Sequence, residues 1–272
     1  MTINTIGFIG AGNMGGAMIG GICNSGLIAP SQVLASDYSA EALSRLEDTY
    51  GIRTTSSNEV VARESDILFL AIKPNKFSEV LPAIASSLKS DCLIVSIAAG
   101  QSIHSVETLL GEAVKIVRAM PNTPALVGEG MSALCCNELV SDEELAYVKK
   151  LFECFGKAEI VAEDIIDTVI GVSGSSPAYV YMFIEAMADA AVADGMPRQM
   201  AYKFAAQSVL GAAKMVLETG THPAALKDAV CSPGGTTIEA VAALEAGGLK
   251  GTIISAQRAC VQKSKDMTRK NS

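Results

Sequence analysis

A glycine-rich turn near the start of the chain restricts the fold more than any other feature. The segment GFIGAGNMGG sets Gly10, Gly12 and Gly15 in a Gly-x-Gly-x-x-Gly pattern directly after an apolar run at 3–9. The first glycine allows a tight turn, the second lets a pyrophosphate approach, and the third lets a helix pack against the strand. Free N–H groups at the start of that helix attract phosphates. The pattern predicts a dinucleotide-binding unit, and a glycine-rich helix start with only a packing role is the alternative.

The first 162 residues alternate between strand-like and helix-like segments. Continuous apolar runs at 67–72 and 93–98 are typical of strands that are buried on both faces of a parallel sheet. The other strand-like runs are 33–36, 52–54, 115–120, 131–136 and 160–161, and helical spacing is found at 40–50 and 145–155. This alternation predicts a doubly wound α/β domain over residues 1–162.

The pattern changes near Glu163, after which helical spacing dominates. The expected helices are 178–193, 198–218, 223–230, 237–246 and 250–268. We therefore expect a second, all-helical domain over residues 163–272. Within it, a Ser-Pro-Gly-Gly-Thr-Thr corner at 232–237 breaks one helical run and starts another. A turn followed by a threonine cap is one reading of the corner; a helix start that binds an anion is the other.

A dinucleotide also needs polar groups where the neighbouring strands end. Asp37 follows Gly15 by 22 residues, close to the ~20 expected of an acid that binds a ribose 2′-hydroxyl. This favours NAD, because a carboxylate repels a 2′-phosphate, although the hydroxyls of Ser36 and Ser39 can donate to one. A turn or cap role is the alternative for Asp37. Lys73 is either a cofactor or substrate contact or an exposed loop lysine.

Composition argues against several classes of function. The net charge is −8 and no basic patch precedes the tail, so neither nucleic acid nor an anionic membrane is an expected partner. The first residues lack the pattern of a signal peptide, and the apolar run at 178–193 is too short to span a bilayer. Seven cysteines without a Cys-x-x-Cys pair predict reduced thiols, a cytoplasmic location and no metal site.

Signatures of acid–base and nucleophilic catalysis are thin. The two histidines, His104 and His222, are interpreted as surface or capping residues, and Glu185 and Asp189 as a polar stripe on a helix. Hydride transfer to an iminium needs no strong general acid, because the acceptor already carries a positive charge and the cofactor supplies the hydride. A site of hydroxyls and backbone amides, such as the corner at 232–237, suits that chemistry.

Six segments, in order along the chain, resemble the pyrroline-5-carboxylate reductases. They are GFIGAGNMGGAM, LAIKP, SIAAG, RAMPNTP, GVSGSSPAYVY and DAVCSPGGTTIEA, and the resemblance runs from residue 6 to about residue 265. It implies a Rossmann-type doubly wound sheet followed by an all-helical dimerisation domain, in a homodimer or a ring of dimers. It also implies that NADPH or NADH reduces the C=N bond of L-1-pyrroline-5-carboxylate to give L-proline.

The resemblance further assigns roles to individual residues. The substrate carboxylate is expected at Ser232, Gly234, Gly235, Thr236 and Thr237, with the catalytic Thr237 hydroxyl near the ring nitrogen. The expected cofactor contacts are Gly10, Ala11, Gly12, Asn13, Met14, Gly15, Ser36, Asp37, Asn58, Ala71, Lys73 and Pro74. The chain departs from the family pattern at Ser176, where the family has a glycine. Asp37 leaves the choice between NADPH and NADH open.

Two other classes of protein share parts of this pattern. Two-domain dehydrogenases of hydroxy acids share this layout but carry a catalytic lysine in the segment corresponding to 171–185, where this chain has none. A non-catalytic NAD(P)-binding protein is expected to have a degenerate substrate loop, whereas residues 232–237 are intact.

Overall fold

The structure is a computed structural model, and it describes residues 3–111 and 114–271. It divides into two compact units: Met1–Ser175 with Cys260–Ser272, and Ser176–Ala259. The boundary expected after residue 162 stays a prediction, since the contacts divide the chain further along.

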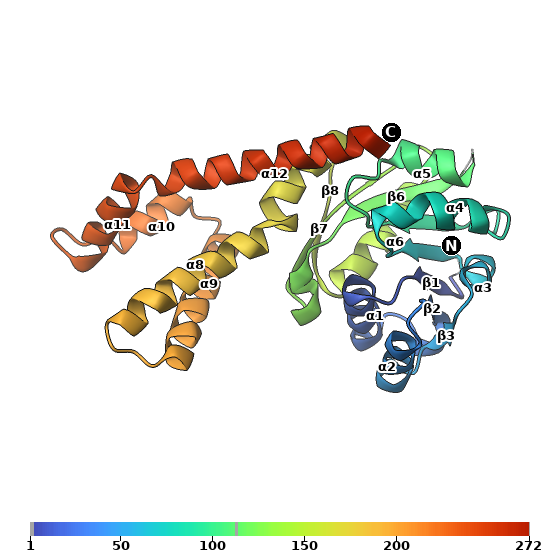
Figure 1. The fold of residues 1–272 in the computed structure, drawn as a ribbon, viewed down its shortest axis with the longest axis horizontal. Coiled ribbons are helices and arrows are strands. Elements are labelled where there is room, and N and C mark those ends of the chain that lie inside the picture. The colour runs from blue at the N-terminus through green and yellow to red at the C-terminus, as the bar shows by residue number, and fades with distance from the viewer. Residues whose placement is uncertain (1–2, 112–113, 272) are drawn as a thin grey trace. The chain divides into compact units, whose positions relative to one another are not determined.

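The first unit is built on one eight-stranded sheet (Figure 1). Its strands are β1 (Ile6–Ile9), β2 (Val33–Ser36), β3 (Arg53–Thr55), β4 (Ile67–Leu70), β5 (Leu93–Ser96), β6 (Lys115–Met120), β7 (Gly130–Cys136) and β8 (Gly156–Ile160). They lie in the order β3-β2-β1-β4-β5-β6-β7-β8, and β1 to β6 are parallel. β7 is antiparallel to β6, and β8 is parallel to β7. The order 3-2-1-4-5-6 is that of a doubly wound dinucleotide-binding sheet, which confirms the fold class.

Helices cover both faces of this sheet. One core cluster contains side chains of α1 (Asn13–Ser25), α2 (Ala40–Tyr50) and α6 (Asp142–Glu153). The other contains side chains of α3 (Asn58–Glu64), α4 (Phe77–Ala85), α5 (Ile103–Leu110) and α7 (Ile166–Val169). Strand side chains alternate between the clusters, so that in β4 Phe69 packs into the first and Leu68 into the second. This two-sided burial explains the continuous apolar runs in the sequence.

The segment after residue 162 is anchored to the sheet, which is why it groups with the first unit. Arg118 of β6 is buried and donates to Glu163 Oε1 at 2.8 Å, and Asn122 Nδ2 donates to the Ser173 carbonyl at 3.0 Å. Asp167 of α7 accepts from the Ser264 hydroxyl, which ties the last turns of the C-terminal helix to the same unit.

The second unit is entirely helical. It comprises α8 (Ser176–Ala193), α9 (Arg198–Thr219), α10 (Pro223–Ala229), α11 (Thr236–Ala246) and the first part of α12 (Leu249–Asn271). α8 packs along α9. Neither α10 nor α11 buries a residue, and large apolar side chains such as Phe204 (65% exposed) and Leu217 (83% exposed) face outward. So much exposed apolar surface indicates an interaction face.

Within residues 3–111 and 114–271, no helix is both long and apolar enough to cross a membrane.

Candidate functional site

The turn between β1 and α1 requires glycine at two of its positions. Gly10 has a φ of +106°, and a Cβ there would lie 2.5 Å from the Ala71 carbonyl oxygen. A Cβ at Gly15 would lie 2.1 Å from the Gly10 carbonyl oxygen. The first glycine therefore permits the turn and the third lets α1 approach it, for the reasons predicted from the spacing.

The start of α1 is open to an anion. Gly12 is the N-cap, no side chain caps the helix, and its first turn carries no acidic residue. The N–H groups before Gly16, whose own N–H donates to the Gly12 carbonyl at 2.7 Å, have no acceptor within the helix. A Cβ built on Gly12 would meet no atom within 4 Å. Free donors facing open space fit the diphosphate of a dinucleotide.

Asp37 fixes the glycine-rich turn to the end of β2. Its Oδ2 accepts from the Ala11 N–H at 2.7 Å, and its Oδ1 accepts from the Ser39 N–H at 2.9 Å. The Gly10 N–H donates to the Ser36 carbonyl at 2.8 Å, so turn and strand form one frame. Each carboxylate oxygen keeps a lone pair, which leaves Asp37 able to accept from a ribose hydroxyl.

The two serines that flank Asp37 have different partners. Ser36 is fully buried, and its hydroxyl donates to Asn58 Oδ1 at 2.7 Å, so its effect on a ligand passes through Asn58. Ser39 is the N-cap of α2, where its Oγ accepts from the Ala42 N–H at 3.2 Å. The Ser39 proton is thereby free for another acceptor, whereas the Ser36 proton is not.

Three expected cofactor residues follow β4. The Ala71 N–H donates to the Ile9 carbonyl at 2.8 Å, which extends the pairing with β1. Lys73 is exposed, forms no ion pair within residues 3–111 and 114–271, and precedes a short 3₁₀ helix, Pro74–Lys76. Both interpretations of Lys73, ligand contact and loop lysine, are compatible with this position.

The Ser-Pro-Gly-Gly-Thr-Thr corner joins α10 to α11 in the second unit. Gly234 has a φ of +69°, which favours glycine, and a Cβ on Gly235 would lie 2.3 Å from Ser232 Oγ. The helix begins one residue earlier than expected, at Thr236, with Gly235 as its N-cap. Of the two readings of the corner, the turn followed by a threonine cap is therefore wrong about the cap, because Gly235 takes that place.

This change leaves the corner with unused donors. No side chain caps α11, and the half-buried Thr237 is its second residue, so the Thr237 hydroxyl is available to a ligand. Glu239 is the acidic residue of the first turn. Ser176, which replaces the family glycine, is simply the first residue of α8, where a helical residue with a Cβ is accommodated.

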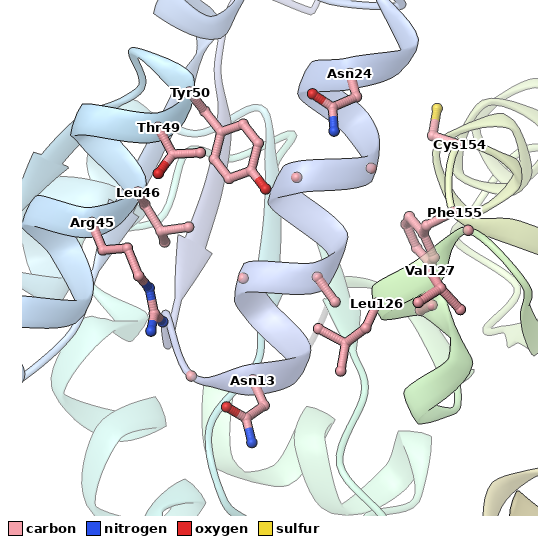
Figure 2. Close-up of a pocket in the computed structure, with 17 residues that line it drawn as sticks. Asn13, Asn24, Arg45, Leu46, Thr49, Tyr50, Leu126, Val127, Cys154 and Phe155 are labelled. Carbon is pink, nitrogen blue, oxygen red and sulfur yellow. The ribbon is translucent and has the colours of Figure 1, made fainter. Parts of the chain in front are cut away.

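A cavity of about 660 Å³ extends along α1 (Figure 2). Gly12 and Asn13 line it together with Arg45 of α2 on one side and residues 126–127 and 155 on the other. Figure 2 shows the Arg45 side chain reaching towards the end of α1 where Asn13 lies. Sequence reasoning missed Arg45, because no motif marks a single arginine on the face of an amphipathic helix.

Two of the seven cysteines are poor candidates for thiolate chemistry. Burial raises the pKa of the Cys92 and Cys135 thiols to about 12, so both stay protonated at neutral pH. Among these residues, no group of three or more His, Cys, Asp or Glu side chains is placed to hold a metal ion.

Comparisons with known proteins match both halves of the chain. A family described as pyrroline-5-carboxylate reductase dimerisation matches residues 163–267, and one described as NADP oxidoreductase, coenzyme F420-dependent, matches residues 5–100. The pyrroline-5-carboxylate reductase of Escherichia coli is 54% identical over 264 residues, which covers 97% of this chain and 98% of that protein. The enzyme of Methanosarcina acetivorans is 43% identical over 265 residues, with the same coverage of 97% and 98%.

Solved structures agree. The pyrroline carboxylate reductase of Plasmodium falciparum with NADP bound is 36% identical, with a TM-score of 0.89 and coverage of 97% of this chain and 98% of that one. The enzyme of Coxiella burnetii is 35% identical, with a TM-score of 0.91 and coverage of 98% and 99%. Prephenate dehydrogenase of Aquifex aeolicus, at 16% identity and a TM-score of 0.54, shares only the fold. The chain belongs to the pyrroline-5-carboxylate reductase family.

Proposed function

We propose that this enzyme reduces the C=N bond of L-1-pyrroline-5-carboxylate with NADPH or NADH and releases L-proline, the last step of proline synthesis. The observation that carries the proposal is the 54% identity with the Escherichia coli reductase over 97% of the chain. The uncapped starts of α1 and α11 support it, because each offers free N–H groups to one of the two anionic reactants.

The corner before α11 binds the substrate carboxylate in this proposal. Backbone N–H groups at the start of the helix donate to the carboxylate, and the two glycines let it approach the main chain closely. Hydroxyl groups flank the same position. The residues concerned are Ser232, Gly234, Gly235, Thr236 and Thr237.

Thr237 serves as the catalytic residue by holding the ring nitrogen with its hydroxyl. The bound NADPH or NADH supplies the hydride. The protonated imine already carries the positive charge that attracts a hydride, so the protein has to position the ring rather than protonate it. In agreement with this assignment, the residues that we assign to the substrate site include no histidine and no pair of carboxylates.

The cofactor contacts in this proposal belong to the first unit. The α1 start, with Gly10, Ala11, Gly12, Asn13, Met14 and Gly15, binds the diphosphate. Ser36 and Asp37 lie at the adenosine ribose, and Asn58, which accepts from the Ser36 hydroxyl, is a further cofactor contact. The nicotinamide end of the cofactor contacts Ala71, Lys73 and Pro74.

We further propose that the enzyme is a homodimer formed through its helical unit, which exposes apolar side chains and matches a family described by its dimerisation. A ring of such dimers stays an expectation from the resemblance. The seven free cysteines suit a reducing compartment, and we propose the cytoplasm.

An absorbance assay tests the activity. Purified protein is mixed with pyrroline-5-carboxylate and either reduced cofactor, and cofactor oxidation is followed together with proline formation. We expect stoichiometric oxidation and proline. A hydroxy acid with the oxidised cofactor serves as the control for the alternative dehydrogenase class. No oxidation of NADPH or NADH in the presence of the imine would refute the proposal.

A further inference from the structure

Arg45 is a cation that the proposed mechanism does not use. It is exposed on α2, and no ion pair or hydrogen bond involves it in the described residues. Yet it lines the same cavity as Gly12 and Asn13 of the diphosphate turn. An unpaired arginine at the edge of a phosphate site is a candidate for a further phosphate contact.

The helix directs Arg45 towards the ribose end of the site. Side chains on an α-helix lean towards its N-terminus, so a residue one and a half turns into α2 carries its guanidinium back to the first turn. In Figure 2 the side chain follows this direction, towards the end of α1 at Asn13. The first turn of α2 begins at Ala40, three residues after Asp37, the expected ribose contact.

The surroundings of that first turn suit an anion. The Ser39 hydroxyl accepts from the Ala42 N–H and keeps its proton for another acceptor. The N–H groups of Ala40 and Glu41 have no acceptor within the helix. Glu41 opposes this, since its carboxylate lies in the same turn, but it forms no ion pair with Arg45 in the structure as described.

We propose that Arg45 determines cofactor specificity by binding the 2′-phosphate of NADPH. Asp37 alone predicts NADH, because its carboxylate repels that phosphate. The Arg45 guanidinium, together with the Ser39 hydroxyl and the start of α2, offsets this repulsion. The enzyme then accepts NADPH while Asp37 still binds the ribose of NADH. The inference rests on the proposed function only in taking NAD(P)H as the cofactor.

Calorimetric titration without imine tests this directly. Wild type and Arg45→Gln are titrated with NADPH, NADH, 2′,5′-ADP and 5′-AMP. For Arg45→Gln, the affinity for NADPH and 2′,5′-ADP should fall about tenfold, while that for NADH and 5′-AMP changes less than about twofold. Arg63→Gln is the matched control, because Arg63 is also exposed but lies in the last turn of α3. All four of its affinities should equal those of wild type.

Two results would overturn the proposal. An equal loss of NADPH and NADH affinity would mean that Arg45 contacts the diphosphate, and unchanged affinities would mean that it contacts neither. If Arg45→Gln has the same melting temperature as wild type, a loss of NADPH affinity does not come from a folding defect. The titrations use no imine and therefore test cofactor binding separately from the reaction. A wild-type protein that binds NADPH but makes no proline would contradict the proposed function and leave the role of Arg45 intact.

Discussion

Thr237 is the residue whose role the structure sharpens most. Since Gly235 and not a threonine caps α11, the Thr237 hydroxyl has no structural task at the helix start. We predict that Thr237→Ala lowers kcat for pyrroline-5-carboxylate by about 10- to 100-fold, the worth of a hydrogen bond to a charged group. Its NADPH affinity should stay at the wild-type value.

Steady-state kinetics and calorimetry measure these two quantities. Thr237→Ser keeps the hydroxyl and should recover most of the turnover, which separates a hydroxyl effect from a packing effect. Wild-type kcat in Thr237→Ala would remove Thr237 from the mechanism.

Asp37 combines two roles that a substitution can separate. Its carboxylate accepts from the N–H groups of Ala11 and Ser39 and can also accept from the ribose. We predict that Asp37→Ser weakens NADH binding about tenfold and NADPH binding less, because the ribose contact is lost but the repulsion of the 2′-phosphate is lost too. The measured ratio of the two dissociation constants should shift towards NADPH. A shift towards NADH would show that Asp37 does not face the ribose.

The same residues show what a sequence can reveal at this scale. Gly10 and Gly15 were predictable, because the positive φ of Gly10 belongs to the turn itself and the close neighbour of Gly15 is the Gly10 carbonyl oxygen, five residues earlier. Ser36 and Arg45 were not. Whether the Ser36 hydroxyl turns to Asn58 or to a ligand, and which face of α2 carries Arg45, depends on packing between segments far apart in the chain.

At the scale of elements, α1 provides a direct test of close packing. A Cβ at Gly15 would lie 2.1 Å from a backbone carbonyl oxygen, whereas at Gly16 the nearest contacts are ordinary, at 3.8 Å. We predict that Gly15→Ala lowers the free energy of unfolding by about 1–3 kcal/mol, as overpacking does, and weakens NADPH binding because the turn must shift. Gly16→Ala should raise the free energy of unfolding by up to about 1 kcal/mol, because alanine favours a helix more than glycine does.

Urea unfolding followed by circular dichroism measures both variants, and calorimetry measures NADPH binding. Since the two substitutions are chemically identical and adjacent, Gly16→Ala is the control for Gly15→Ala. Equal stability of the two variants would show that α1 can move away from the turn without cost.

The predicted boundaries of elements were good where both faces of a strand are buried and poor where only one residue is. The runs 67–72 and 93–98 contain β4 and β5, because both faces of these strands are buried. β8 was expected at 160–161 but is Gly156–Ile160, since only Ala158 of this edge strand is buried and its sequence lacks an apolar run. α11 starts at Thr236 because glycine, without a side chain, can still serve as the N-cap.

At the scale of the whole molecule, the order of elements determined the fold class and the six ordered segments indicated the family. Neither the order of elements nor the six segments predicted the contacts between distant parts of the chain. The pairs Arg118–Glu163 and Asp167–Ser264 join residues 163–175 and the end of α12 to the sheet, and no local pattern announces either pair. The sequence also could not show that apolar side chains of the helical unit are exposed, because a buried helix and an interface helix have the same composition.

Those faces carry the last prediction, which concerns assembly. Leu210 and Phe204 on α9 are more than half exposed and line one shallow hollow, and a stable dimer buries such side chains over at least about 1,000 Å². We predict that Phe204→Glu separates the dimer into monomers in analytical ultracentrifugation, because a buried unpaired carboxylate is costly. Leu139→Glu, at an exposed leucine of the first unit, is the control and should leave the sedimentation coefficient unchanged. Since the proposed cofactor contacts lie in the first unit, monomeric Phe204→Glu should bind NADPH as wild type does but reduce the imine slowly. A dimer that persists in Phe204→Glu would place the interface on another face of the helices.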